Sequence, residues 1–419
     1  MELKKGAVNR YATLLVRDVP SCQIAHLKHR FELAPASLLA EKVCTLTNEA
    51  IAAWEKEQGI TRVRPGEVVF TFSGQPVKLP LLPPAALEHL AHGVSVRAVR
   101  REIENEAFLA LKTAKPHASF EDLWRLLDQG ELVSRRRGQE EDFLPEAPLD
   151  VQTLAVKHRR FTALEAFPRA ALAPAIQALE KEWNVRPGQA EAMVTLASQL
   201  YAWCSPRMEE LSFGQVVWLA RGTRKSRHTD PRLFSPVVLT LLTPEEAELP
   251  CQSRTAFKAL KVRQLERITA EAWQQDAVLT TLDLEWLLSL QPGLIRELLE
   301  AYHERFGVLL PTAGTVLDMG RTLTHKAIVV EMALAGLTTQ EIARRIYHTP
   351  EAVDSYLRLF ERVLLLTYYQ VPEAVMPRIT GHSPGLLEEH LNLVRKHFPS
   401  REAIAAYLNQ HGVKVQMGS

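Results

Sequence analysis

The sequence has few cysteines, no long apolar run and almost no net charge, and each shortage excludes a class of protein. Its four cysteines form no C-x-x-C pair, which argues against a zinc knuckle, an iron–sulfur site or a secreted disulfide framework. The longest apolar run, around Val363 to Thr367, is far shorter than the roughly 18 residues that a membrane span needs. The N-terminal residues contain no export signal. We therefore expect a cytoplasmic protein that does not span a membrane.

The charge is balanced, with 50 Lys and Arg against 49 Asp and Glu. The net charge therefore does not indicate nucleic-acid binding, and any such binding must depend on local clusters of positive charge. The hydrophobic share of 46% and the charged share of 24% are typical of a folded, soluble protein. A chain of 419 residues suits two or three domains.

Sequence motifs for several common chemistries are missing. There is no P-loop, no G-x-G-x-x-G after a strand, no H-E-x-x-H and no G-x-S-x-G. We therefore predict that the protein is not an enzyme and that it uses no cofactor and no metal. The carboxylates of DNA-cleaving and DNA-joining enzymes have no fixed spacing, so that activity stays open as an alternative.

The chain contains an internal duplication, in which similar segments recur in the same order. Residues 29–50 align with 181–200, residues 67–70 with 215–218, and residues 76–82 with 236–242. Each copy has two short β-branched segments between longer helical patterns, which predicts helices, a β-hairpin and further helices. We predict a mainly α fold with small β-hairpins, built from duplicated helix-hairpin-helix modules and tandem, partly winged helix-turn-helix units.

The predicted boundaries follow from this pattern. A divergent N-terminal copy covers residues 1–140, and a charged, proline-containing linker covers 141–150. The second copy covers 151–320 and ends in a winged-helix-like unit. A tandem helix-turn-helix domain covers 321–419.

The two predicted hairpins differ in their connections. The first turns through Ser73-Gly74-Gln75, whereas the second inserts a basic arm over residues 221–232. Such an arm can lie along a phosphate backbone, although it can also be a solvated loop tip. The arm residues proposed as DNA contacts are Arg221, Arg224, Lys225, Arg227 and Arg232.

The clearest motif lies at residues 336–358. Thr338 and Glu341 can form a capping box, and Ile342, Ala343 and Ile346 form one apolar stripe of a short helix. Thr349 can cap a second helix with Pro350 at its first position, so only three residues separate the two helices. A helix pair with so short a turn crosses steeply, which is the arrangement of a DNA-binding helix-turn-helix.

The second helix of this motif has two predicted faces. Val353, Tyr356 and Leu357 should face the core. The residues expected to face outward, where they can meet base edges in the major groove, are Glu351, Asp354, Ser355 and Arg358. Further predicted contacts are Thr349, Arg344 and Arg345.

This segment resembles the helix-turn-helix of LuxR-type response regulators and of sigma-factor region four. Those proteins usually present lysine or threonine where Glu351 and Asp354 stand here. Acidic groups at these positions either read cytosine amino groups or weaken the attraction to phosphate.

Two further segments repeat the pattern. Residues 378–391 repeat the cap and proline as Ser383 and Pro384, and residues 280–297 contain a third version. Residues 306–316 are short extended segments around a turn, which predicts the wing of a winged helix. These units add four predicted DNA contacts, namely Arg296, Arg378, His382 and Ser383.

The C-terminal part resembles a prokaryotic family known as domain-of-unknown-function 1670. Its motifs are present at residues 311–316, 324–326, 342–353 and 380–383, and the resemblance covers roughly 185–400. It implies a prokaryotic DNA-binding regulator associated with mobile elements and implies no chemistry. From the motifs and this resemblance we predict sequence-specific binding to double-stranded DNA, by a transcriptional regulator or mobile-element control protein. The alternatives are a plasmid-type replication initiator and a helical scaffold that docks protein. A homodimer stays open.

Overall fold

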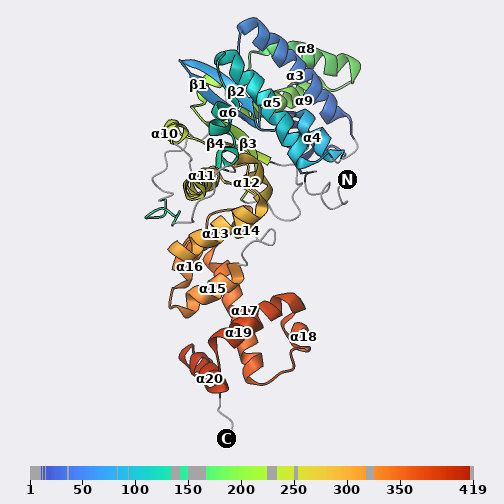
Figure 1. Ribbon diagram of the computed structural model, residues 1–419. Coiled ribbons are helices and arrows are strands. Elements are labelled where there is room, and N and C mark those ends of the chain that lie inside the picture. The colour runs from blue at the N-terminus through green and yellow to red at the C-terminus, as the bar shows by residue number, and fades with distance from the viewer. Residues whose placement is uncertain are drawn as a thin grey trace. The chain divides into compact units, whose positions relative to one another are not determined.

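The fold is mainly helical and contains one small antiparallel sheet, which confirms the predicted mixture of helices and short strands. The structure is a computed structural model (Figure 1). It describes residues 11, 13–14, 16–34, 37–82, 84–92, 94–133, 142–149, 167–223, 234–249, 253–317 and 325–415. In the described part, no helix is both long enough and apolar enough to span a bilayer.

Two compact units make up the chain, unit 1 (residues 1–306) and unit 2 (residues 307–419). The two copies predicted from the sequence therefore fold together in unit 1, and unit 2 begins 14 residues before the predicted boundary at 321. Residues 142–149, from the predicted linker, lie on a helix of unit 1: the Leu149 amide donates to Glu266 Oε1 at 3.2 Å, and Lys258 Nζ lies 5.1 Å from the Phe143 ring centre.

Unit 1 has two halves, residues 19–133 and 167–306. The first half contains α2 (Val19–Arg30), α3 (Leu39–Gln58), β1 (Glu67–Phe72), β2 (Gln75–Pro80), α4 (Pro84–Ala91), α5 (Val96–Ala114), α6 (Phe120–Leu126) and α7 (Gln129–Val133). The second half contains α8 (Arg169–Glu182), α9 (Pro187–Cys204), the 3-10 helix η2 (Met208–Glu210), β3 (Gln215–Gly222), β4 (Phe234–Thr240), α10 (Pro244–Glu248), α11 (Arg254–Gln274), β5 (Ala277–Val278), α12 (Thr281–Leu287) and α13 (Pro292–Phe306). Apart from η2 and β5, the two halves have the same order of elements.

The two hairpins join into one sheet in the order β2-β1-β3-β4, with β5 paired to β3. At the centre β1 and β3 run antiparallel, and Val68 pairs with Val216, its own counterpart in the sequence alignment. The Gly66 amide donates to the Val217 carbonyl at 2.9 Å, and the Gly214 amide donates to the Val69 carbonyl at 2.7 Å. Exchanging the halves exchanges these two hydrogen bonds, as an approximate two-fold axis through the Val68–Val216 pair requires.

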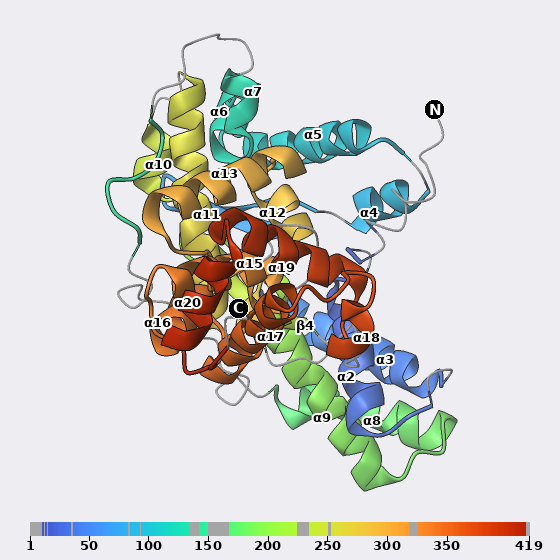
Figure 2. The ribbon, with the colours of Figure 1, turned by 90° about the horizontal axis from the view of Figure 1, so that it is seen from below.

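Helices cover the sheet in two groups. Figure 2 shows α2, α3, α8 and α9 gathered on one side of unit 1, where Leu27, Ile51, Leu179 and Met193 belong to a shared core. The two long helices α5 and α11 pack on the outer strands, α5 on β2 and α11 on β4.

Unit 2 is helical in its described part. It contains α14 (Ala313–Leu317), α15 (His325–Leu334), α16 (Thr339–Ile346), α17 (Pro350–Tyr368), α18 (Met376–Thr380), α19 (Pro384–His397) and α20 (Arg401–Gln410). One core contains Ile342 of α16 and Val353 of α17, and a second contains Phe360 of α17 and Leu391 of α19. Helix α17 therefore contributes side chains to both cores.

The predicted wing at residues 306–316 is wrong for its second part, because residues 313–317 form α14. The local cause is Thr312, whose hydroxyl accepts a hydrogen bond from the Thr315 amide at 3.2 Å. A threonine that satisfies an amide of the first turn favours a helix start over an extended strand.

Candidate nucleic-acid interface

Helix α16 begins where the sequence predicts. The Glu341 amide donates to Thr338 Oγ1 at 3.3 Å, and the Thr338 amide donates to Glu341 Oε2 at 2.8 Å, so the predicted capping box is present. The buried residues Ile342, Ala343 and Ile346 face the first core of unit 2. The helix therefore exposes its polar side and is fixed by its apolar one.

The turn after α16 is tight and is held by specific contacts. Tyr347 has a left-handed backbone with φ of 57°, which is strained for a bulky side chain. The His348 ring shares a hydrogen bond of 2.9 Å with the Thr315 carbonyl oxygen and lies edge-on to Tyr356. Thr349 then caps α17 by accepting from the Ala352 amide at 3.3 Å, and Pro350 occupies its first turn. These contacts fix where the second helix begins.

The two faces of α17 are those that the sequence predicts near its start. Val353 is fully buried, while Tyr356 and Leu357 are half-buried. The four residues predicted to face outward are all exposed, namely Glu351, Asp354, Ser355 and Arg358. The sequence reasoning missed Arg362, which is also exposed and follows Arg358 by four residues. That spacing was the available signal, because residues four apart share a helix face.

Three of the four acidic side chains of this helix pair are hydrogen-bonded to its threonines. Glu341 accepts from Thr338, and these hydrogen bonds lower the pKa of its carboxyl. The pKa of the Glu351 carboxyl is likewise lowered, by hydrogen bonds from the Glu351 backbone N–H and from the Thr349 hydroxyl.

Asp354 lies one turn further along α17. Its Oδ1 accepts from Thr339 Oγ1 at 3.0 Å, which joins α17 to the first turn of α16. Three of the four carboxylates of this helix pair thus have local hydrogen-bond partners, and the fourth, Glu361, lies half-buried on α17.

The arginines of the same pair form no ion pair within the described part of the chain, although Arg345 and Arg344 lie close enough to Glu341 to help lower the pKa of its carboxyl. Four are exposed, and none forms an ion pair with a carboxylate of the described residues: Arg344, Arg345, Arg358 and Arg362. Ser355, Arg358 and Arg362 form one stripe along α17, about 10 Å from first to last at 1.5 Å per residue. The four arginines of the pair balance its four carboxylates, so the pair differs from the rest of the chain in how its charges are partnered and not in its net charge.

The pair formed by α18 and α19 is different. Helix α18 ends at Gly381, whose φ is 73°, and Pro384 begins α19, but Ser383 makes no capping hydrogen bond. The predicted cap at Ser383 is therefore wrong, because its neighbour Pro384 starts the helix without it. Arg378, His382 and Ser383 are exposed, as contact with a ligand would require.

Helix α19 exposes acidic residues near its start. Glu388 and Glu389 lie on its surface, and Arg395 bonds Glu373 at 2.7 Å and Glu388 at 2.9 Å. The positive charge of Arg395 is therefore neutralised by two carboxylates.

The pair formed by α12 and α13 lies in unit 1. Thr280 and Asp283 form its capping box, and α12 is largely buried. Arg296 of α13 is exposed, but its Nε donates to Glu300 Oε1 at 2.7 Å. Glu297 is bound by Lys258 at 2.6 Å. The exposed charges at the start of α13 are thus paired within the protein.

The predicted basic arm lies mostly outside the described residues, which do not include Arg224, Lys225, Arg227 and Arg232. Arg221 is described, and it belongs to strand β3, where it pairs with Phe234 and Val278. Burial and the neighbouring Arg17 lower the pKa of the Arg221 guanidinium. Its place in the projecting arm was therefore wrong, because β3 continues to Gly222.

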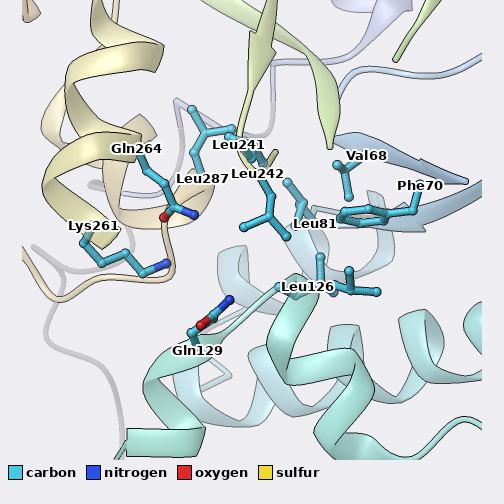
Figure 3. A pocket seen from close by; sticks show the side chains of 11 residues that line it. Val68, Phe70, Leu81, Leu126, Gln129, Leu241, Leu242, Lys261, Gln264 and Leu287 are labelled. Carbon is cyan, nitrogen blue, oxygen red and sulfur yellow. The ribbon is translucent and has the colours of Figure 1, made fainter. Parts of the chain in front are cut away.

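A small cavity lies in unit 1 between the sheet, α7 and α11 (Figure 3). Its volume is about 10 Å³, and its walls are mainly leucine. Gln129 and Gln264 line it, and the Oε1 atoms of both have no hydrogen-bond partner within the described structure. A cavity of this size has room for about one water molecule. Over the same described residues, no group of three or more His, Cys, Asp or Glu side chains is placed to hold a metal ion.

Comparison with known proteins places the chain in a family without an assigned activity. The family described as "Protein of unknown function (DUF1670)" matches residues 179–393, and the chain belongs to it. The match runs from α8 to α19, so it includes α16 and α17 and leaves out the first half of unit 1. No curated protein and no solved structure matches the chain.

Proposed function

We propose that this protein binds double-stranded DNA through α16 and α17, with α17 entering the major groove. The observation that supports this most is the division of charge on their surface. Three of the four carboxylates of the pair accept hydrogen bonds from threonines, while four exposed arginines form no ion pair with a carboxylate among the described residues.

Nucleic acid is the partner that fits this pattern. Unpaired guanidinium groups gain affinity when they neutralise phosphates and release condensed counterions. An α-helix with its side chains is about 10–12 Å in diameter, which fits a major groove about 12 Å wide. The local strain at Tyr347 and the His348 contact fix the angle at which α17 leaves the turn.

The test is a salt titration of DNA binding by the full chain. Affinity for a mixed-sequence duplex should fall steeply between about 50 and 200 mM salt. Replacing Arg344, Arg345, Arg358 and Arg362 together by Gln should lower the affinity. The slope of log K against log salt should become shallower by up to about 0.9 for each phosphate that the variant no longer neutralises. Circular dichroism checks that the variant remains folded.

The matched control uses charges that are already paired. Arg395→Gln and Lys396→Gln remove two exposed cations of the same unit that are bound to Glu373 and Glu331. They should change the slope much less than the four-arginine variant. A wild-type protein that binds no duplex at any of these salt concentrations would contradict the proposal.

Regulation of transcription, control of a mobile element and initiation of replication all require DNA binding, and the proposal supports each of them equally. A protein-docking scaffold is the second candidate. It is favoured by three large apolar side chains exposed along the end of α17 and α18: Tyr369 (56%), Val375 (42%) and Ile379 (55%). Replacing Ile379 by Ser should leave DNA binding intact if this surface serves protein contacts alone.

A further inference from the structure

The three helix pairs that the sequence predicts as DNA-binding units differ in the charges that their second helices leave unpaired. On α13, Arg296 is bound to Glu300, and on α19, Arg395 is bound to Glu373 and Glu388. Only on α17, among the described second helices, does an exposed basic stripe remain without a carboxylate partner. The pairs share a pattern of caps and prolines, but they do not share a surface chemistry.

Within that stripe, Arg358 is held in a defined orientation. Its Nε donates to the Asp354 carbonyl oxygen at 3.2 Å, while the Asp354 carboxylate accepts from Thr339 at 3.0 Å. The two Nη groups of Arg358 have no hydrogen-bond partner in the described structure. A guanidinium group anchored through Nε presents its other two nitrogens as a fork.

A fork of two donors selects a partner with two acceptors side by side. In DNA these are N7 and O6 of guanine in the major groove, or two oxygens of a phosphate. Ser355 lies one turn before Arg358 and Arg362 one turn after it, so Arg358 occupies the middle of the exposed stripe. In a helix-turn-helix the second helix lies in the major groove with its N-terminal part against the base edges, and Arg358 lies about two turns from the start of α17.

We propose that, among the described helices, α17 is the one that reads base sequence, and that Arg358 reads a guanine through N7 and O6. The inference rests on the proposed function, and it names the residue and the base on which specificity depends. The backbone carbonyl of Asp354 positions Arg358, and the Asp354 side chain is itself occupied by Thr339.

The experiment selects bound duplexes from a random library with the full-length protein. The expected result is one contiguous motif that contains an essential guanine. Replacing that base by 7-deazaguanine, which lacks N7, should weaken binding by wild type about 5- to 150-fold, the range for a bidentate base contact. The same replacement should have little effect on Arg358→Gln, which has no guanidinium fork to bond N7.

The matched variants are Arg296→Gln and Arg395→Gln, which remove paired arginines from the other two second helices. Both should select the wild-type motif. Arg358→Lys should keep general affinity but lose the preference for guanine, because an ammonium group has no planar fork.

Other outcomes would overturn the inference. If 7-deazaguanine has no effect while Arg358→Gln weakens all duplexes equally, Arg358 contacts phosphate and the assignment is wrong. If Arg296→Gln or Arg395→Gln changes the motif, more than one helix reads bases. If no duplex is enriched or bound, the proposed function fails as well. If a duplex is bound but its binding does not depend on the N7 atom of guanine, only the guanine assignment fails.

Discussion

The two halves of unit 1 have the same order of elements but bury their long helices differently. Helix α5 buries one stripe, formed by Val99, Ile103, Ala107 and Leu111, and exposes the rest. Helix α11 buries most of its length, because it contacts β4, α7 and α13, and residues 142–149 also lie on it. Equivalent helices of the two halves can therefore contribute very different amounts to the free energy of unfolding.

The outer edges of the sheet show this difference most clearly. On β4, Gln275 Oε1 accepts from the Val238 amide at 3.0 Å, and its Nε2 donates to the Val238 carbonyl at 2.8 Å. On β2, Pro76 and Pro80 lack the amide hydrogens that an added strand would bind. One edge is closed by side chains and the other by prolines, so both are protected from further strand pairing.

The largest predicted difference concerns Asp122 and Asp283, which occupy equivalent capping positions. Asp283 is fully buried, forms an ion pair with Arg17 and accepts from Trp218 Nε1 at 3.1 Å. Asp283→Ala leaves the buried Arg17 without its carboxylate, so we expect a loss of about 3–5 kcal/mol in the free energy of unfolding. Asp122 is partly exposed, and hydrogen bonds from Lys115 and Ser119 lower its pKa to about 2.

Asp122→Ala, in contrast, should cost about 1 kcal/mol through loss of a cap. Denaturant unfolding of both variants measures the two values. Equal losses would show that the halves are energetically alike at these positions.

The next largest difference concerns the equivalent glycines at the start of β1 and β3. Gly66 and Gly214 have φ of +84° and +70°, so alanine is strained at both. A Cβ at Gly214 would overlap the Leu242 carbonyl, whereas the nearest atom to a Cβ at Gly66 lies 3.4 Å away on Leu82. We expect Gly214→Ala to cost about 3 kcal/mol or more and Gly66→Ala about 1–2 kcal/mol. Thermal melting of the two variants measures both losses. A larger loss for Gly66→Ala than for Gly214→Ala would contradict the packing described for the two strand starts.

The smallest predicted difference concerns Glu106 and Glu271. Glu271 is buried and accepts from the Thr240 amide at 2.6 Å, while Glu106 is exposed. Glu271→Ala should cost about 1–2 kcal/mol, because the Thr240 amide loses its partner. Glu106→Ala should stay within about 0.5 kcal/mol of wild type.

The effect of Glu271→Ala should also depend on pH. Burial raises the pKa of Glu271 above its ordinary 4.5, so at pH values just above 4.5 the folded state binds more protons than the unfolded state. Its contribution to stability therefore falls as pH rises above about 4.5, and the cost of Glu271→Ala should be larger at pH 5 than at pH 8. A constant cost across this range would argue against a buried carboxyl at this position.

Local signals in the sequence predicted much of the candidate interface. The caps at Thr338 and Thr349, the proline at 350 and the apolar stripe act within one or two turns, so the residues alone indicate where α16 and α17 begin. Ser383 shows the limit of such signals, since a serine before a proline need not make the hydrogen bond that its position allows.

Contacts between residues far apart in the sequence could not be predicted from local sequence patterns. The pairing of Val68 with Val216 joins strands 148 residues apart, and no local pattern specifies that register. The hydrogen bond from Thr339 to Asp354 likewise depends on how two helices cross. Arg362 was missed because it lies beyond the first turns of α17, although its exposure continues the same helical spacing.

Helix α17 places Val353 in one core of unit 2 and Phe360, Val363 and Leu364 in the other. Neither core can therefore loosen by itself without disturbing a helix that the other core holds. The two should open together as one cooperative element, with the backbone amides in the middle of α17 among the slowest of the unit to exchange with solvent hydrogen. An exposed stripe carried on such a helix keeps its side chains in register even while the ends of the unit fluctuate.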